Sequence, residues 1–273
     1  MSDLLRALFG TAKPVIAMMH ARALPGRPGH DAADGMRPIK EALARDLDAL
    51  QQAGVDGLLF CNEADLPYQL ATGPETAAAM AALIGELNST IKKPFGIDIV
   101  WDPVASLAVA RATGACFVRE VFTGTYESDL GLMQPAFGDI AGYRTSIGAD
   151  EVAIFANITP EFASPLGDRT APQRAASAVF LGVDAVLITG PITGQPTSIT
   201  ELRNVKAAVP AAPVLASTGV TADTVNQTLE AADGVIVGTH LKRDGVTWNP
   251  VDPARAARFM AAARQARSEM MVI

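Results

Sequence analysis

Eight short apolar runs recur along the chain, and helical runs rich in Ala and Leu separate them. Such alternation predicts a parallel sheet whose strands are joined by crossover helices. The predicted strands are residues 15–20, 57–62, 95–100, 117–121, 151–158, 185–189, 213–217 and 234–238. The predicted helices are residues 38–53, 74–91, 103–113, 172–181, 198–208, 221–231 and a final helix at 252–267.

The spacing of these units favours closure into a ring. Gly54, Gly114 and Gly182 each stand between a predicted helix and the next strand, where a helix commonly ends. Eight units follow without a linker, and no GxGxxG follows the first strand, which argues against an open dinucleotide-binding sheet. We therefore expect one (β/α)8 barrel domain over residues 1–273, with its strands at about 15–238 and a frayed tail beyond Ser268.

Composition narrows the possible partners. The net charge is −7 and the basic residues are scattered, so we expect no nucleic-acid partner. Cys61 and Cys116 lie in strand-like runs and do not form a disulfide framework. Residues 1–10 lack the apolar core of a signal peptide, and no later run approaches ~18 apolar residues. We expect a cytoplasmic protein without a membrane span, which forms a homo-oligomer through its outer helices or its loop ends.

Polar residues at the predicted strand ends mark the candidate site, because barrel enzymes place their chemistry on the loops that follow the strands. Asp98, Glu120 and His20 are the candidates for proton transfer. The candidates for substrate binding are Asn62, Arg119, Asn157 and Thr189.

The two neighbours Arg119 and Glu120 should point to opposite faces of their strand, so only one of them is expected to face the pocket. Arg119 could hold a carboxylate or phosphate of the substrate by two parallel hydrogen bonds. The alternative is structural, because an ion pair of Arg119 with Asp98 or Glu120 would tie adjacent strands together.

The turns after the last two predicted strands indicate a phosphate site. Ser217 and Gly219 follow the seventh strand, and Gly238 and Thr239 follow the eighth, where barrels often bind phosphate with backbone N–H groups. Glycine lets the backbone approach a ligand closely. The alternative is that these glycines only make tight turns. We expect a small phosphorylated or anionic ligand.

The sequence gives less support to a metal site, a cysteine nucleophile or a Schiff-base lysine. The chain has no HExxH motif, so no metal site is assigned and no cofactor is predicted, although His20, Asp98 and Asn157 could converge on a divalent metal. Cys61 is either a core residue or a weak nucleophile. The lysines lie outside the predicted strand interiors, which argues against Schiff-base catalysis.

The motifs resemble those of the BtpA/SgcQ family of barrel proteins over nearly the whole chain. The segment ADGVIVGTHLKRDG at 232–245, followed by NPVD at 249–252, is similar to the closing signature of that family. The opening phrase is represented by Met18-Met19-His20 and by LPGRP at 24–28, with Ala23 where Pro is usual. The resemblance implies a barrel of the ribulose-phosphate-binding type, and it implies no defined reaction.

This chain departs from the family pattern at several strand ends. Cys61 replaces a Glu, and Asp98 and Trp101 replace an Asn and an Arg. Asn157, Thr159, Glu161 and Phe162 stand where many members have Asp, His, Lys and His. We expect these changes to leave fewer basic and carboxylate groups in the middle of the pocket and to alter the substrate.

Three functions are compatible with these observations. The first is an enzyme acting on a small sugar-phosphate-like metabolite by proton transfer, as an isomerase or lyase. The second is a non-catalytic ligand-binding or assembly factor, since a barrel alone does not imply a reaction. Metal-assisted hydrolysis is a third possibility, which would require a bound metal.

Overall fold

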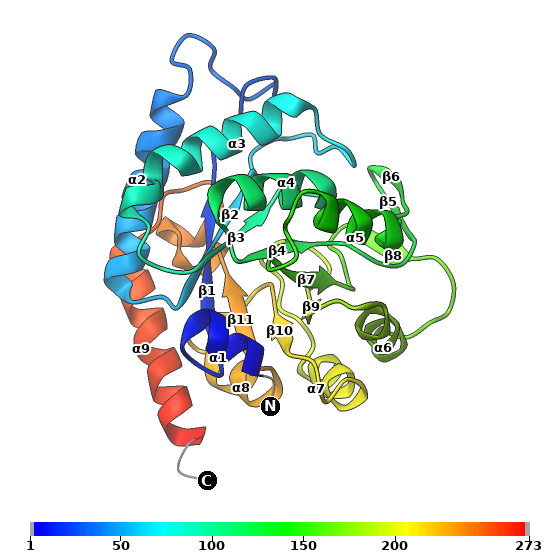
Figure 1. The fold of residues 1–273 in the computed structure, drawn as a ribbon. Helices are drawn as coiled ribbons and strands as arrows, with labels where there is room; N and C mark the ends of the chain where they lie inside the picture. Colours follow the sequence, from blue (N-terminus) through cyan, green and yellow to red (C-terminus); the bar gives the residue numbers. More distant parts are fainter. Residues whose placement is uncertain (1–2, 271–273) are drawn as a thin grey trace.

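The computed structural model describes residues 3–270, and its centre is a closed barrel of eight parallel strands (Figure 1). Strands pair in the order β1-β11-β10-β9-β7-β4-β3-β2, so the first and last strands in the sequence complete the ring. The predicted (β/α)8 fold class is confirmed, and each predicted strand contains one barrel strand. These are β1 (Val15–His20), β2 (Gly57–Cys61), β3 (Phe95–Asp98), β4 (Phe117–Glu120), β7 (Ala153–Asn157), β9 (Ala185–Ile188), β10 (Val214–Ala216) and β11 (Gly234–Val237).

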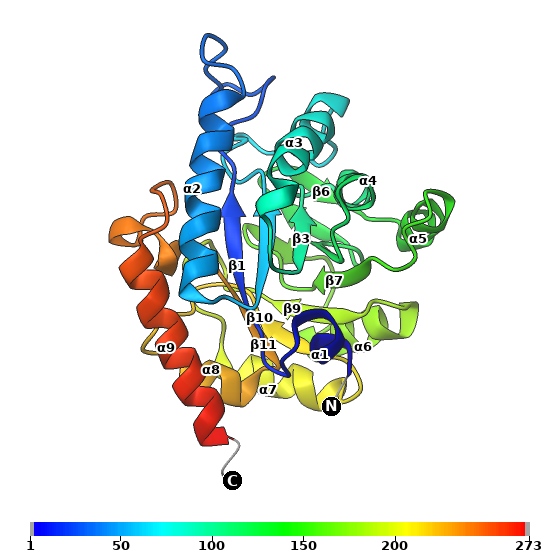
Figure 2. The same ribbon diagram turned by 60° about the vertical axis from the view of Figure 1, so that its left-hand side comes forward.

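Helices surround the barrel and bury their apolar faces against it (Figure 2). Local sequence sets their ends: Thr170 and Gln173 form a reciprocal capping box at the start of α6, and Gly182 ends that helix at φ 104°. The outer helices are α2 (Arg37–Ala53), α3 (Pro74–Leu87), α4 (Pro103–Thr113), α5 (Phe137–Ser146), α6 (Ala171–Leu181), α7 (Ile199–Ala208), α8 (Val225–Ala231) and α9 (Pro253–Met270).

A short helix that the sequence reading left unassigned, α1 (Asp3–Phe9), closes the end of the barrel where the strands begin. The Phe9 ring contacts Phe117 edge to face at 5.5 Å between centroids, and Phe117 stacks on Phe155 at 4.7 Å. Gly57 leaves room for this plug, because a Cβ there would lie 2.6 Å from the Phe9 ring. The opposite end, where the strands finish, remains available for a ligand.

Other elements also differ from prediction. A small antiparallel sheet, β6-β5-β8, joins the loops after β4 and β7, and its strands are β5 (Tyr126–Ser128), β6 (Gly131–Met133) and β8 (Ala163–Pro165). Three 3-10 turns complete the described structure: η1 (Asn88–Thr90), η2 (Thr239–Leu241) and η3 (Arg243–Gly245).

The final helix runs further than expected. The predicted fraying beyond Ser268 is wrong for residues 269 and 270, which continue α9, because Ala263 and Ala266 pack this helix against the core. Residues 271–273 lie outside the described part. No helix within residues 3–270 combines the length and apolar character needed to cross a membrane.

Candidate active site

A cavity of about 280 Å³ lies at the carboxyl ends of the barrel strands. Most of the predicted site residues meet there, although they come from distant parts of the chain. The predicted residues that line it are His20, Asp98, Arg119, Glu120, Asn157, Ser217, Gly219, Gly238 and Thr239. Asn62 and Thr189 are not among the lining residues.

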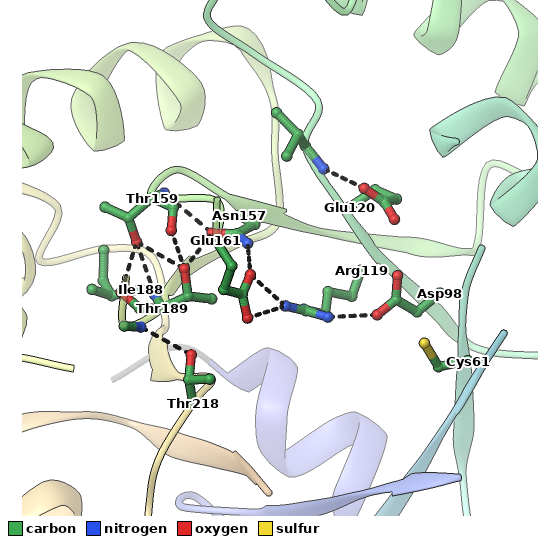
Figure 3. A network of polar contacts seen from close by, with 12 residues as sticks. Cys61, Asp98, Arg119, Glu120, Asn157, Thr159, Glu161, Ile188, Thr189 and Thr218 are labelled. Carbon is green, nitrogen blue, oxygen red and sulfur yellow. Dashed lines mark hydrogen bonds and ion pairs between the residues drawn. The ribbon is translucent and has the colours of Figure 1, made fainter. Parts of the chain in front are cut away.

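One side of the cavity is acidic, and we call the four carboxylates Glu63, Asp98, Glu120 and Glu161 the carboxylate wall. Arg119 is a neighbour of these groups, and Figure 3 shows it between Asp98 and Glu161. Its Nη1 donates to Asp98 Oδ2 at 2.5 Å, and its Nη2 lies 3.4 Å from Glu161 Oε2. Arg119 therefore forms the ion pair between adjacent strands that was the alternative to ligand binding, because it joins β4 to Asp98 of β3 inside the cavity.

Glu120 also borders the cavity, so the expectation that only one of Arg119 and Glu120 would face it is wrong. The strand β4 ends at Glu120, where strict alternation of side chains stops. Glu120 accepts hydrogen bonds from the backbone N–H groups of Trp101, at 2.7 Å, and Val121, at 2.9 Å. Burial, and then the charge of Asp98, raise the pKa of Glu120 well above its usual value.

Two members of the wall, Glu63 and Glu161, were missed by the sequence reading. Burial raises the pKa of Glu63 to about 7, and the charges of Asp98 and Glu161 add to the effect. Burial also raises the pKa of Glu161, while Arg119 opposes the rise. The position of Glu63, two residues after β2, was the available signal, and Glu161 lies in a loop whose path the sequence did not define.

Two loops place carboxylates in the middle of the pocket. Glu63 and Glu161 supply carboxylates there in addition to Asp98 and Glu120. A residue-by-residue comparison with the family pattern could not show which loop positions turn inward.

The opposite side of the cavity is formed by loops, and we call it the loop face. It consists of residues after β9, β10 and β11, namely Thr193, Gly194, Ser217, Thr218, Gly219, Thr239 and His240, with Arg255 from α9. In an eight-stranded ring, strands four places apart stand opposite each other, so β10 and β11 face β3 and β4 across the barrel. Asp98 and Glu120 of the carboxylate wall therefore lie across the cavity from the loops after β10 and β11, while Glu161, after β7, lies beside the loop after β9.

The loop face contains unused hydrogen-bonding groups. Ser217 Oγ is buried and has no partner within residues 3–270. Thr239 and His240 begin the 3-10 turn η2, so their N–H groups have no partner inside that turn. His240 Nε2 accepts from the Ala222 N–H at 3.2 Å, which leaves the proton of the neutral ring on Nδ1.

The two site glycines have a packing role that the sequence reading did not separate from ligand binding. A Cβ on Gly219, whose φ is +67°, would lie 2.3 Å from the Pro196 nitrogen. A Cβ on Gly238 would lie 3.0 Å from His20 Cε1. Both glycines line the cavity and also let protein segments approach each other.

His20 stands between the two sides at the end of β1. Burial, and then the nearby charge of Lys242, lower its pKa well below the usual value, so the ring is neutral. Its Nδ1 is buried without a partner in the described part of the chain. A neutral imidazole with a free nitrogen can donate or accept one hydrogen bond from a ligand.

The predicted residues outside the cavity hold loops in place. Asn62 donates to Asp65 and accepts from the Val100 N–H, both at 2.8 Å. Thr189 bonds to the Thr159 carbonyl, as Figure 3 shows. The fully buried Cys61 has a pKa raised by burial, which favours the core role over the nucleophile.

Two aromatic residues that line the cavity have unusual backbones. Trp101 has φ 68° and Phe162 has φ 58°, in the left-handed region that bulky residues rarely adopt. Strained residues of this kind are concentrated at binding sites. Trp101 Nε1 is also buried without a partner among residues 3–270, so it can donate to a ligand.

Residues 3–270 contain no cluster of three or more His, Cys, Asp or Glu side chains able to hold a metal ion. In the same range no lysine borders the cavity. Lys242, the lysine closest in sequence to the loop face, is buried in an ion pair with Asp46 at 2.8 Å.

Fold and site together define a (β/α)8 barrel protein with a ligand cavity at the carboxyl ends of its strands. The chain belongs to the BtpA family, whose model matches residues 11–265. It is 47% identical over 257 residues to the sgc region protein SgcQ of Escherichia coli (strain K12), covering 94% of this chain and 96% of that protein.

More distant proteins share the architecture. The Photosystem I biogenesis protein BtpA of Synechocystis is 31% identical over 260 residues, which cover 93% of this chain and 89% of the relative. The solved N-(5'-phosphoribosyl)anthranilate isomerase of Pyrococcus furiosus superposes with a TM-score of 0.55 at 12% identity, covering 93% of this chain and 99% of that chain. At that identity the likeness concerns the fold alone.

Proposed function

We propose that this protein is an enzyme that binds a small phosphate monoester and moves a proton on it, as an isomerase or lyase would. One observation carries the proposal: a single cavity places carboxylates opposite a face of unpaired donors. Phosphate would bind at the loop face, through Ser217 and the first N–H groups of η2, with Arg255 nearby. The rest of the ligand would then reach the carboxylate wall.

The proposed chemistry is general acid–base catalysis. An acid or base works best when its pKa lies near the working pH, and the pKa of Glu63 is about 7. Glu63 is therefore the best placed of the carboxylates to accept and return a proton. Arg119 keeps Asp98 in position, and neutral His20 would hold an oxygen of the ligand by one hydrogen bond.

The first test is binding. Inorganic phosphate and a panel of sugar phosphates should raise the melting temperature, because a ligand held by the folded state alone stabilises it. Ser217→Ala should reduce the rise, whereas Ser146→Ala, on the surface of α5, should not. No rise with any phosphate compound would contradict the proposal.

The second test separates catalysis from binding. With the best ligand in D₂O, a proton-transfer enzyme should incorporate deuterium at carbon, which NMR detects directly. Glu63→Gln and Asp98→Asn should lower that rate at least 100-fold while the ligand still raises the melting temperature. Binding without any exchange in the unmodified protein would instead support the non-catalytic alternative.

A further inference from the structure

The carboxylate wall has little positive charge left for a ligand. Arg119 contacts both Asp98, at 2.5 Å, and Glu161, at 3.4 Å, so its two terminal nitrogens already have acidic partners. Within residues 3–270, the other basic side chains that line the cavity are His20, His240 and Arg255, and they come from the loop face or from β1. A second anionic group on the ligand would therefore meet carboxylates without a free cation.

The same wall offers both acceptors and donors of hydrogen bonds. Oxygens of Glu63 and Glu161 can accept, while Arg119 Nε and Trp101 Nε1 are buried donors without a partner in the described chain. A hydroxyl group donates one hydrogen bond and accepts others, so it can satisfy both kinds of group at once. An ammonium group lacks the acceptor, and a carboxylate lacks the donor.

We infer that the ligand is the phosphate monoester of a neutral polyol or sugar, and that Glu63 and Glu161 exclude ligands with an acidic far end. The inference rests on the proposed function, because it places the phosphate at the loop face. A buried carboxylate or second phosphate beside Glu161 would lose its hydration and be repelled. Sugar-acid phosphates and bisphosphates should accordingly bind weakly.

A matched pair of compounds tests this selectivity. Sorbitol 6-phosphate and 6-phosphogluconate have the same open chain and differ at the far end, which is a hydroxymethyl group in one and a carboxylate in the other. Isothermal titration calorimetry at pH 8.5, above the pKa of Glu63, should show sorbitol 6-phosphate binding at least tenfold more tightly. Inorganic phosphate should compete with it, since both would occupy the loop face.

Variants identify the source of the selectivity. Glu161→Gln and, separately, Glu63→Gln should each reduce the ratio of the two affinities at least threefold, mainly by improving 6-phosphogluconate. Glu86→Gln, which removes an exposed charge on α3 that pairs with Lys40, should leave the ratio unchanged.

The outcomes distinguish the inference from the function on which it rests. Equal or tighter binding of 6-phosphogluconate, with phosphate still competing, would overturn the charge selectivity and leave the phosphate site intact. Failure of inorganic phosphate and of both esters to bind would overturn the phosphate site, and the inference with it.

Discussion

Single residues determine how the cavity responds to pH. The folded pKa of Glu63 is raised from 4.5 to about 7, so between these values the folded protein keeps a proton that the unfolded chain releases. The contribution of this proton to the free energy of unfolding is therefore fully present below pH 4.5 and is lost as the pH rises through 7. Glu120 and Glu161 act in the same direction, because burial raises their pKa values too.

We expect Glu63→Gln to weaken this pH dependence. Between pH 5 and pH 8 the free energy of unfolding should fall less in the variant than in the parent, by up to about 3 kcal/mol. Urea unfolding at the two pH values measures the difference. An identical fall in both proteins would show that Glu63 is not protonated in the fold.

Gly219 provides a second test at the residue scale. Gly219→Ala would place a Cβ against the backbone of Pro196 and keep a left-handed φ, so we expect a loss of about 2–3 kcal/mol or more. The control is Gly138→Ala in α5, where a Cβ has open space and Ala favours the helix. If both variants unfold at the same urea concentration, the close approach at Gly219 is not important.

Sequence reasoning found those residues of the site whose position depends on strand ends. Asp98, Arg119, Asn157 and Ser217 could be placed at one end of a barrel, and the structure brings them into one cavity. Glu161 could not be placed this way, because its position depends on a loop rather than on a periodic pattern. The sequence also did not show which polar side chains bond to each other. Asn62, for example, ties loops together through its hydrogen bonds to Asp65 and the Val100 N–H.

Among the elements, α1 makes the clearest energetic contribution. Phe9→Ala should leave a cavity beside the stacked rings of Phe117 and Phe155 and cost about 3–5 kcal/mol of stability, measured by urea unfolding. Phe180→Ala on α6 is the matched control, since that ring is 89% exposed and should contribute close to nothing. Equal losses for the two variants would refute the role of α1 as a plug.

Elements with strong periodicity were predictable, and short ones were not. The barrel strands appear as apolar runs because both of their faces are buried. Strands β5, β6 and β8 are short and largely exposed, so no apolar run marks them, whereas β10 is equally short but fully buried. Helix α5 contains Gly138 and Gly142, which favour other conformations, so its helical state depends on packing.

At the scale of the whole molecule, a buried ion pair links the segment after the last barrel strand, β11, to the helix after the first, α2. Lys242, after β11, reaches Asp46 in α2, which also accepts a hydrogen bond from the Val251 N–H at 2.9 Å. Lys242→Met should cost about 3–5 kcal/mol, because it leaves a buried carboxylate unpaired. In the double variant with Asp46→Asn the amide still accepts from Val251, and the loss should be smaller than the sum of the single losses. Additive losses in urea unfolding would mean that the two residues act independently.

The closure of the ring by β11 also governs the order of events during synthesis. Strand β1 pairs with β11 through residues 235–237, so nearly the whole chain must be made before β1 gains its second neighbour. Until then β1 and β10 each present an unpaired edge, which is prone to join with other chains. Nascent chains that stall before β11 should therefore aggregate or require chaperones, while the completed chain hides both edges at once.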